Sequence, residues 1–209
     1  MKRAVILIIF SIIYSFGFTQ VIRDADAVTP FHDGLTSVKK NNQWAFFNKE
    51  GVKVIGFRSD LVATIEDRFI DENGMSSVSY PLFKEDRCLI RKLIDGYYHY
   101  GYIDKTGKEV IAPQYVNASN FVNGYAIIIK FAKNVLGENE VLNKRIVSYK
   151  LEEYIIDHTG KMVMYLDNAR NSTPAKMKKN VRPSFESKFM APHLIAVKTK
   201  NKTWDIYKF

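Results

Sequence analysis

This sequence contains a single cysteine, Cys88, among its 209 residues. One thiol cannot close an internal disulfide, so the fold has to be held together by its core alone. Cys88 lies in a short apolar stretch that is typical of a strand, and we interpret it as a small buried apolar residue rather than as a nucleophile. Because no cysteine lies near the N-terminal apolar segment, a lipid-anchored form is not expected.

Motifs of known catalytic classes are absent too. The sequence has no Gly-x-Ser-x-Gly elbow, no phosphate-binding loop and no His-Glu-x-x-His pair. The four histidines stand apart, and none has a metal-ligand spacing to another: His32, His99, His158 and His193. The acidic segment of residues 71–74 lacks a full calcium-loop pattern and is interpreted as a plain turn. We therefore predict a protein that is not an enzyme and that uses no cofactor or metal.

One long apolar run occurs, at residues 4–18, after the basic pair Lys2 and Arg3. Its 15 residues are short for a bilayer core of ~30 Å, which needs about 20 helical residues. A small residue at Ser15 and another at Gly17 give a signal-peptidase spacing, with a second possible cut at residues 19–20. Residues 1–19 are thus predicted to be a secretory signal peptide, with an uncleaved anchor or a buried strand as rival interpretations. We expect export to the periplasm, the outer surface or the medium, without stable membrane insertion after cleavage.

Positive charge exceeds negative charge, giving a formal net charge of +9, or +7 once Lys2 and Arg3 are removed with the signal. Such a surface favours loose attraction to anionic material. The only dense basic tract contains four cations, which we take as a candidate ligand or partner surface, although a solvated loop is the plainer interpretation: Lys176, Lys178, Lys179 and Arg182. Export argues against nucleic acid as the partner.

A repeated pattern organises the rest of the chain. A Phe precedes a short apolar strand, a polar turn, an aromatic strand, an Asp/Asn-x-x-Gly turn and a further strand. Four copies can be recognised, near residues 31–55, 83–115, 121–164 and 189–209, and the last is truncated. We predict that residues 20–209 form one all-β domain of tandem antiparallel β-hairpin repeats in an elongated or curved sheet array. Minor helix is expected in the insertions at residues 56–81, 131–150 and 165–188, although periodicity does not decide between helix and strand for residues 61–69 or for residues 136–147.

The Asp/Asn-x-x-Gly element has a local physical reason. An Asp or Asn at the first position bonds the backbone two residues on, and Gly at the fourth accepts the left-handed conformation of a bulged hairpin. Three copies of this turn are present, starting at Asn48, Asp104 and Asp157 and ending at Gly51, Gly107 and Gly160. We interpret these six residues as structural.

The second copy resembles the WG-repeat family. Residues 100–108, Tyr-Gly-Tyr-Ile-Asp-Lys-Thr-Gly-Lys, match the family's Trp-Gly-Tyr-Ile-Asp-x-x-Gly-Lys pattern with Tyr100 in place of Trp. Residues 110–115, Val-Ile-Ala-Pro-Gln-Tyr, match its Ile-x-Pro-x-Tyr return. No intact Trp-Gly pair occurs, since Trp44 precedes an alanine and Trp204 an aspartate. The resemblance implies an all-β repeat array, often exported or surface-located, with no shared enzymatic activity.

Tyrosines cluster before the second turn. Tyr98, Tyr100 and Tyr102 alternate along the expected strand, so they share one face and are interpreted as core, whereas Tyr97 faces the other way. Tyr97 is therefore a candidate anchor for a partner, because exposed aromatics often serve this role. Our leading hypothesis is an exported, non-enzymatic binding module for a protein or glycan of the cell envelope. The alternatives are an envelope hydrolase whose site is assembled from loops between repeats, and a structural envelope component.

Overall fold

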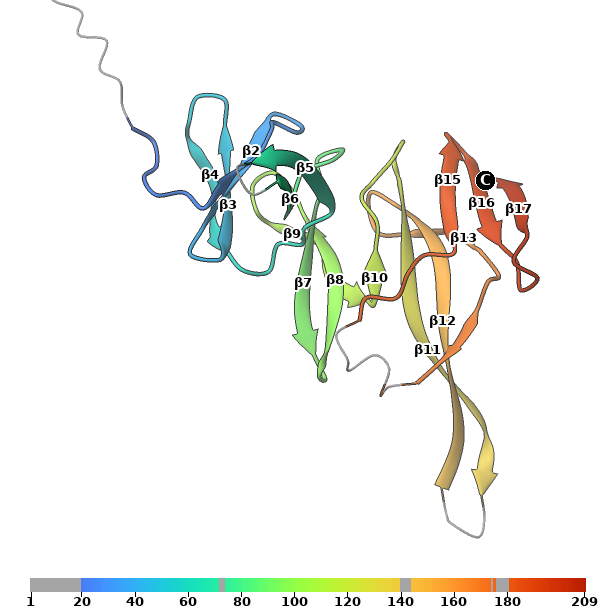
Figure 1. The fold of residues 1–209 in the computed structure, drawn as a ribbon. Coiled ribbons are helices and arrows are strands. Elements are labelled where there is room, and N and C mark those ends of the chain that lie inside the picture. The colour runs from blue at the N-terminus through green and yellow to red at the C-terminus, as the bar shows by residue number, and fades with distance from the viewer. Residues whose placement is uncertain (1–19, 72–73, 140–143, 174, 176–180) are drawn as a thin grey trace, which may run out of the picture.

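Strand dominates the computed structural model, which describes residues 20–71, 74–139, 144–173, 175 and 181–209. Strand accounts for 61% of the chain and helix for 1%, so the predicted all-β class is confirmed. Four antiparallel sheets follow one another along the molecule (Figure 1), and their main strands define units 1 to 4. These are β2 (Leu35–Lys40), β3 (Gln43–Asn48) and β4 (Lys53–Arg58) in unit 1; β7 (Cys88–Ile94), β8 (Tyr97–Ile103) and β9 (Glu109–Tyr115) in unit 2; β11 (Tyr125–Asn139), β12 (Lys144–Asp157) and β13 (Met162–Tyr165) in unit 3; and β15 (Ser187–Ala191), β16 (Leu194–Lys198) and β17 (Trp204–Lys208) in unit 4.

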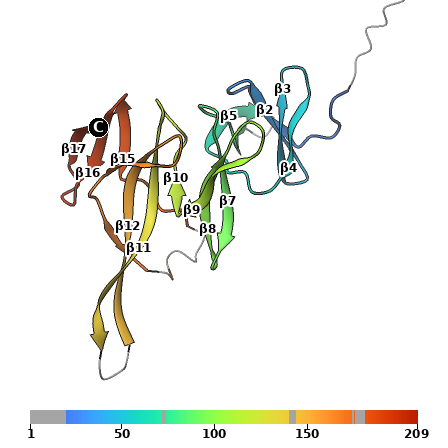
Figure 2. The same ribbon diagram turned by 180° about the vertical axis from the view of Figure 1, so that it is seen from behind.

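Shorter strands complete the sheets. In unit 1, β1 (Ala27–Val28) pairs with β2, and in unit 3, β10 (Asn117–Ala118) and β14 (Arg170–Ser172) pair with β11 and β12. The first insertion forms a separate hairpin of β5 (Ile65–Asp71) and β6 (Gly74–Tyr80). The second lengthens β11 and β12 into a two-stranded arm that leaves the body of the molecule, as both views show (Figures 1 and 2). Where minor helix was expected, the first two insertions thus form paired strands.

The core explains why a phenylalanine opens each unit. Phe83 of unit 2 packs edge-on against Phe46 in the middle strand of unit 1, with ring centres 4.8 Å apart. Phe121 of unit 3 meets Tyr102 in the middle strand of unit 2 in the same way, at 4.9 Å. All four rings are almost completely buried. Such edge-to-face pairs contribute about 0.5–1.5 kcal/mol beyond their buried area. The opening rings of units 2 and 3 therefore join each of these units to the one before it.

The single thiol belongs to this core. Cys88 at the start of β7 is fully buried in the cluster between units 1 and 2, beside Ile103 and Ile90. Burial raises the pKa of the Cys88 thiol, because an apolar environment disfavours the thiolate. Only the thiolate is a good nucleophile, so Cys88 contributes packing and not reactivity.

Each Asx-x-x-Gly segment forms the turn into the third strand of its unit. Gly107 N–H donates to Asp104 O at 2.9 Å, and Gly160 N–H donates to Asp157 O at 2.9 Å. Both glycines have φ near +85°, a region that side chains rarely adopt. The turns also contact the preceding unit, because a Cβ added at Gly107 would lie 3.5 Å from Ile55. The same holds between Gly160 and Ile111, at 3.3 Å. These turns therefore shape each unit and stack it on its predecessor.

The turn carboxylates make folding sensitive to acid. The Thr106 hydroxyl, at 2.5 Å, is the main reason that the pKa of Asp104 lies below its ordinary value of 3.8, and the N–H groups of Thr106 and Lys108 add to the effect. A carboxyl whose pKa is lower in the folded state contributes stability above its unfolded pKa. That contribution is lost as the pH falls through the lowered folded pKa, so it disappears below about pH 4.

We expect Asp104→Asn to fold normally, because Asn48 holds the equivalent turn of unit 1 by accepting the Val52 N–H at 2.8 Å. The substitution should change the free energy of unfolding at neutral pH by less than about 1 kcal/mol. Its loss of stability below about pH 4 should be smaller than that of the wild type. Urea unfolding at neutral and acidic pH measures both quantities, and an unchanged acid dependence would contradict the prediction.

Candidate functional site

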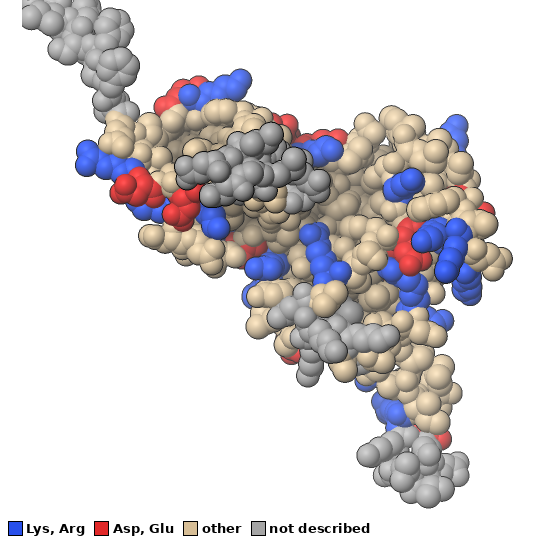
Figure 3. Space-filling model, in the orientation of Figure 1, with Lys and Arg blue, Asp and Glu red and all other residues tan. Residues whose placement is uncertain are grey.

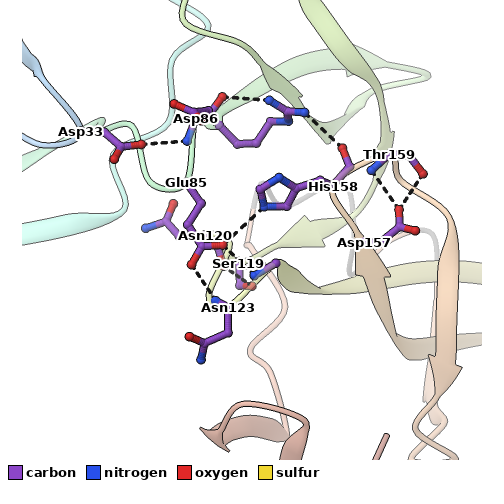
Figure 4. Close-up of polar contacts among 11 residues, drawn as sticks. Asp33, Glu85, Asp86, Ser119, Asn120, Asn123, Asp157, His158 and Thr159 are labelled. Carbon is purple, nitrogen blue, oxygen red and sulfur yellow. Dashed lines mark hydrogen bonds and ion pairs between the residues drawn. The ribbon is translucent and has the colours of Figure 1, made fainter.

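A row of polar contacts connects the opening turns of the first three units (Figure 4). In each turn the two central residues have positive φ: Asp33 and Gly34, Glu85 and Asp86, Asn123 and Gly124. The Asp33 carboxylate accepts the Asp86 N–H at 2.7 Å. The Glu85 carboxylate accepts the N–H groups of Asn123, at 2.6 Å, and of Gly124, at 2.8 Å. Each acidic side chain thus binds the backbone of the next turn, and we call this row the polar seam.

Glu85 has the least expected conformation in the polar seam. Its φ of +51° costs energy for a residue with a long side chain, and the other two turns place Asp or Asn at this position. The contacts offset that cost, since His158 Nε2 lies 3.3 Å from the Glu85 carboxylate in addition to the two N–H donors. Burial alone would raise the pKa of Glu85, but the hydrogen bonds from Gly124, Asn123 and His158 outweigh it and lower the pKa. These groups satisfy one another, so the polar seam holds the opening turns of the first three units together.

A groove of about 680 Å³ lies between units 1 and 2. Units 1 and 2 supply its aromatic side chains, and the segment before unit 4 adds Arg182. Its lining is Lys39, Asn42, Trp44, Ser59, Asp60, Leu61, Val62, Ala63, Arg91, Tyr98, Tyr100 and Arg182. Trp44 and Tyr100 occupy the same position in their units, four residues before Asn48 and Asp104 respectively. The aromatic residue at this repeat position, Trp44 in unit 1 and Tyr100 in unit 2, therefore also lines the groove.

Three cations lie over the aromatic rings of this wall. Arg91 has its guanidinium carbon 4.4 Å from the centre of the Tyr98 ring, and Arg182 lies 4.7 Å from that of Tyr100. Lys39 Nζ is more distant, at 6.0 Å from the Trp44 ring. Such contacts contribute about 0.5–1 kcal/mol at exposed sites and more when desolvated. Trp44 and Tyr100 are themselves buried, so the cations, and not the ring faces, are what a ligand would meet.

Arg182 is the best-anchored cation of the groove. Its Nη2 donates to Ala118 O at 2.6 Å and its Nε donates to the Asn117 side chain, which in turn donates to Pro183 O at 2.7 Å. Burial lowers the pKa of the Arg182 guanidinium, although arginine remains protonated at neutral pH. A cation held from several directions needs little reorganisation when an anion arrives.

The charge of the groove is positive on balance. Asp60 is the one carboxylate among the lining residues that the structure describes, and both its oxygens accept hydrogen bonds from Arg58 at 2.6 Å. That ion pair leaves Lys39, Arg91 and Arg182 without a lining carboxylate to match them. Figure 3 shows lysine and arginine side chains gathered on the middle of one face of the molecule, with few acidic side chains beside them. The groove is therefore suited to an anion.

Of the residues that the sequence suggested as a ligand surface, Arg182 and Tyr97 lie among the described residues. Arg182 lines the groove, whereas Lys176, Lys178 and Lys179 lie outside the described residues. Tyr97 does face away from Tyr98, but it is half-buried against Phe131, with ring centres 6.3 Å apart, and does not line the groove. Sequence reasoning missed Lys39 and Arg91. The available signal was a cation opposite the aromatic position in the hairpin of two successive copies. Lys39 pairs with Trp44 in this way, and Arg91 pairs with Tyr100.

Within the described residues, no group of three or more His, Cys, Asp or Glu side chains is arranged to hold a metal ion. No helix in this part of the chain is long and apolar enough to cross a membrane.

Comparison with known proteins gives a family match. The family model described as WG containing repeat matches residues 26–44 and 100–130. These segments include Lys39 and Trp44 in unit 1 and Tyr100 in unit 2, together with the Asp104 turn. No curated protein and no solved structure matches the chain.

Proposed function

We propose that this chain, a WG-repeat protein with degenerate copies, is an exported, non-enzymatic binding module whose groove between units 1 and 2 binds an acidic glycan. The observation that carries the proposal is the set of three cations, Lys39, Arg91 and Arg182, each placed on an aromatic ring of one groove. Export is supported by the basic, apolar and small-residue pattern of residues 1–19. N-terminal sequencing of the protein from envelope and medium fractions tests it, and an intact Met1 on cytoplasmic protein would count against it.

The chemistry of the groove supports an acidic glycan in two ways. Guanidinium groups bind carboxylates, sulfates and phosphates through paired N–H donors, and Arg91 and Arg182 both line the groove. The lining also includes the amide of Asn42 and the hydroxyl of Ser59, which are suited to sugar hydroxyl groups. Binding should therefore depend on both charge and hydroxyl pattern.

The groove supports hydrolysis less well. Glycoside hydrolysis commonly uses a pair of carboxyl groups on either side of the bond that breaks. Asp60 is the one carboxyl group among the described lining residues, and it is paired with Arg58. We therefore keep binding, and not turnover, as the proposed activity.

Replacing Arg91 by alanine should weaken binding to an acidic polysaccharide such as polygalacturonate by about tenfold to a hundredfold. This range corresponds to the ~1.5–3 kcal/mol of one hydrogen bond to a charged group. Lys92→Ala is the matched control, because Lys92 is exposed and is the next residue along β7, so its side chain points to the opposite face. It should change binding by less than about threefold.

Titration calorimetry with polygalacturonate, and with neutral dextran as the comparison, measures these effects. Wild-type protein that binds dextran as tightly as polygalacturonate would contradict the proposed ligand class. Equal losses of affinity in Arg91→Ala and Lys92→Ala would show that the polysaccharide is attracted by overall charge. They would contradict binding in the groove. If the protein captures an acidic envelope protein through Arg91 and does not bind polysaccharide, the ligand of the groove is a protein and the proposed glycan is wrong.

A further inference from the structure

The arm formed by β11 and β12 presents a second surface, far from the groove. The two strands pair continuously from Tyr125 and Asp157 at the body to Asn139 and Lys144 at the far end. Other strands join this pair only near the body, where β14 pairs with residues 149–151 and β10 with residues 128–129. Residues 134–138 and 145–148, which we call the ribbon, therefore form a two-stranded element whose described residues pair only with each other (Figures 1 and 2).

Apolar side chains are exposed at the outer part of the ribbon. Val135, Leu136 and Ile146 are 56%, 67% and 50% exposed. Val135 pairs with Val147, and Ile146, the neighbour of Val147, points to the opposite face. The pairing register shifts between Val135 and Gly137, which places Leu136 in a bulge. Apolar surface is thus presented on both faces, which is not the arrangement of a strand that covers a core on one side.

Cations accompany this apolar surface. Among the described side chains of residues 133–138 and 145–148, the two cations Lys133 and Arg145 outnumber a single acid, Glu138. Arg145 and Glu138 form an ion pair at 3.3 Å with both side chains well exposed, at 72% and 67%. An exposed pair of this kind contributes little to stability, so Arg145 can exchange Glu138 for another anion at small cost.

We propose that the ribbon binds reversibly to an anionic lipid surface, with Val135, Leu136 and Ile146 entering the headgroup and acyl boundary. Lys133 lies three residues before Leu136, or roughly 10 Å at about 3.4 Å per strand residue, which lets it reach headgroup phosphates while Leu136 is immersed. Peripheral elements of this kind bury apolar side chains about 5–10 Å deep and add attraction to anionic lipids. Contact of this kind leaves the rest of the chain in water, in keeping with the expectation of no stable membrane insertion. The inference is independent of ligand binding in the groove.

Vesicle flotation with the full chain tests the proposal. Wild-type protein should float with phosphatidylcholine vesicles that contain phosphatidylglycerol, and much less with phosphatidylcholine alone. The variant Leu136→Ser/Ile146→Ser should bind the anionic vesicles about tenfold or more weakly, since it removes two apolar side chains from the contact. Val28→Ser/Val181→Ser is the matched control, because both valines are 67% exposed and lie outside the ribbon, and it should bind like the wild type.

Circular dichroism and unfolding curves establish that both double variants fold, and their exposed positions make folding robust. Wild-type protein that stays with the soluble fraction for both vesicle types would overturn the proposal, as would equal binding by the two double variants. Sedimentation velocity tests the alternative that the apolar side chains of the ribbon contact a second copy of the chain. A dimer that Leu136→Ser/Ile146→Ser abolishes, in protein that ignores vesicles, would assign the ribbon to a second copy of the chain and also overturn the proposal.

Discussion

Replacing Arg170 by methionine should lower the free energy of unfolding by about 3–5 kcal/mol, the range found when one partner of a buried ion pair is removed. Glu153 in β12 has a side chain only 1% exposed, and Arg170 Nη2 lies 3.1 Å from it. The Glu186 N–H, at 2.8 Å, and the Ser187 hydroxyl also donate to this carboxylate. Neither neutral donor can replace the positive charge, so methionine would leave a buried and unpaired carboxylate.

The double variant Glu153→Gln/Arg170→Met provides the control. Glutamine keeps an oxygen acceptor for the Ser187 hydroxyl and the Glu186 N–H but carries no charge. The free energy of unfolding of the double variant should therefore exceed that of Arg170→Met by at least about 1 kcal/mol. Urea unfolding monitored by tryptophan fluorescence measures the three variants. A loss of less than about 1 kcal/mol in Arg170→Met would mean that the ion pair does not stabilise the joint between units 3 and 4.

Substituting Gly101 by alanine should lower the free energy of unfolding by up to about 3 kcal/mol, the cost of overpacking a rigid interior. A Cβ at Gly101 would lie 2.6 Å from Pro113 N and 2.8 Å from Ala112 C, and closest of all to Ile111 O. These are backbone atoms of β9, where the register with β8 shifts, so they cannot rotate away as a side chain would. Gly101→Val should cost more than Gly101→Ala.

Gly56→Ala is the control for a glycine in a strand. Gly56 lies in β4, and a Cβ at this position would meet nothing within 4 Å. The substitution should change the stability by less than about 0.5 kcal/mol, as surface changes usually do. Thermal and urea unfolding of the two alanine variants measures the difference. Equal stabilities would contradict the view that close backbone approach is why the repeat has glycine there.

The local parts of this fold could be predicted from sequence because their causes are local. The turn from Asp104 to Gly107 depends on one side-chain oxygen and one left-handed glycine, and both are visible in four consecutive residues. Alternation along residues 97–102 separates Tyr97 from Tyr98, Tyr100 and Tyr102, but it did not predict that Tyr97 is itself half-buried against Phe131. The recurring opening phenylalanine was visible as a pattern, but its reason, contact with the middle strand of the preceding unit, depends on how the units stack.

The candidate site could not be predicted in the same way. Arg182 reaches Tyr100 across 82 residues of chain, and no spacing rule connects the two positions. Glu153 occupies the repeat position that holds Trp44 in unit 1 and Tyr100 in unit 2, and a carboxylate there makes sense only once Arg170 is seen beside it. The arm was expected to contain some helix, and its strand character follows from the long pairing of β11 with β12. Contacts between distant segments decided each of these features.

The contact between an opening phenylalanine and the middle strand of its predecessor has a consequence for how such genes can change. Unit 2 brings both a ring at its start, Phe83, and an aromatic receptor, Tyr102, for the ring that follows, as Phe46 of unit 1 does for Phe83. Duplicating one whole copy therefore supplies both halves of the new junction at once. Arrays of this design can lengthen or shorten by whole copies without a new interface having to arise.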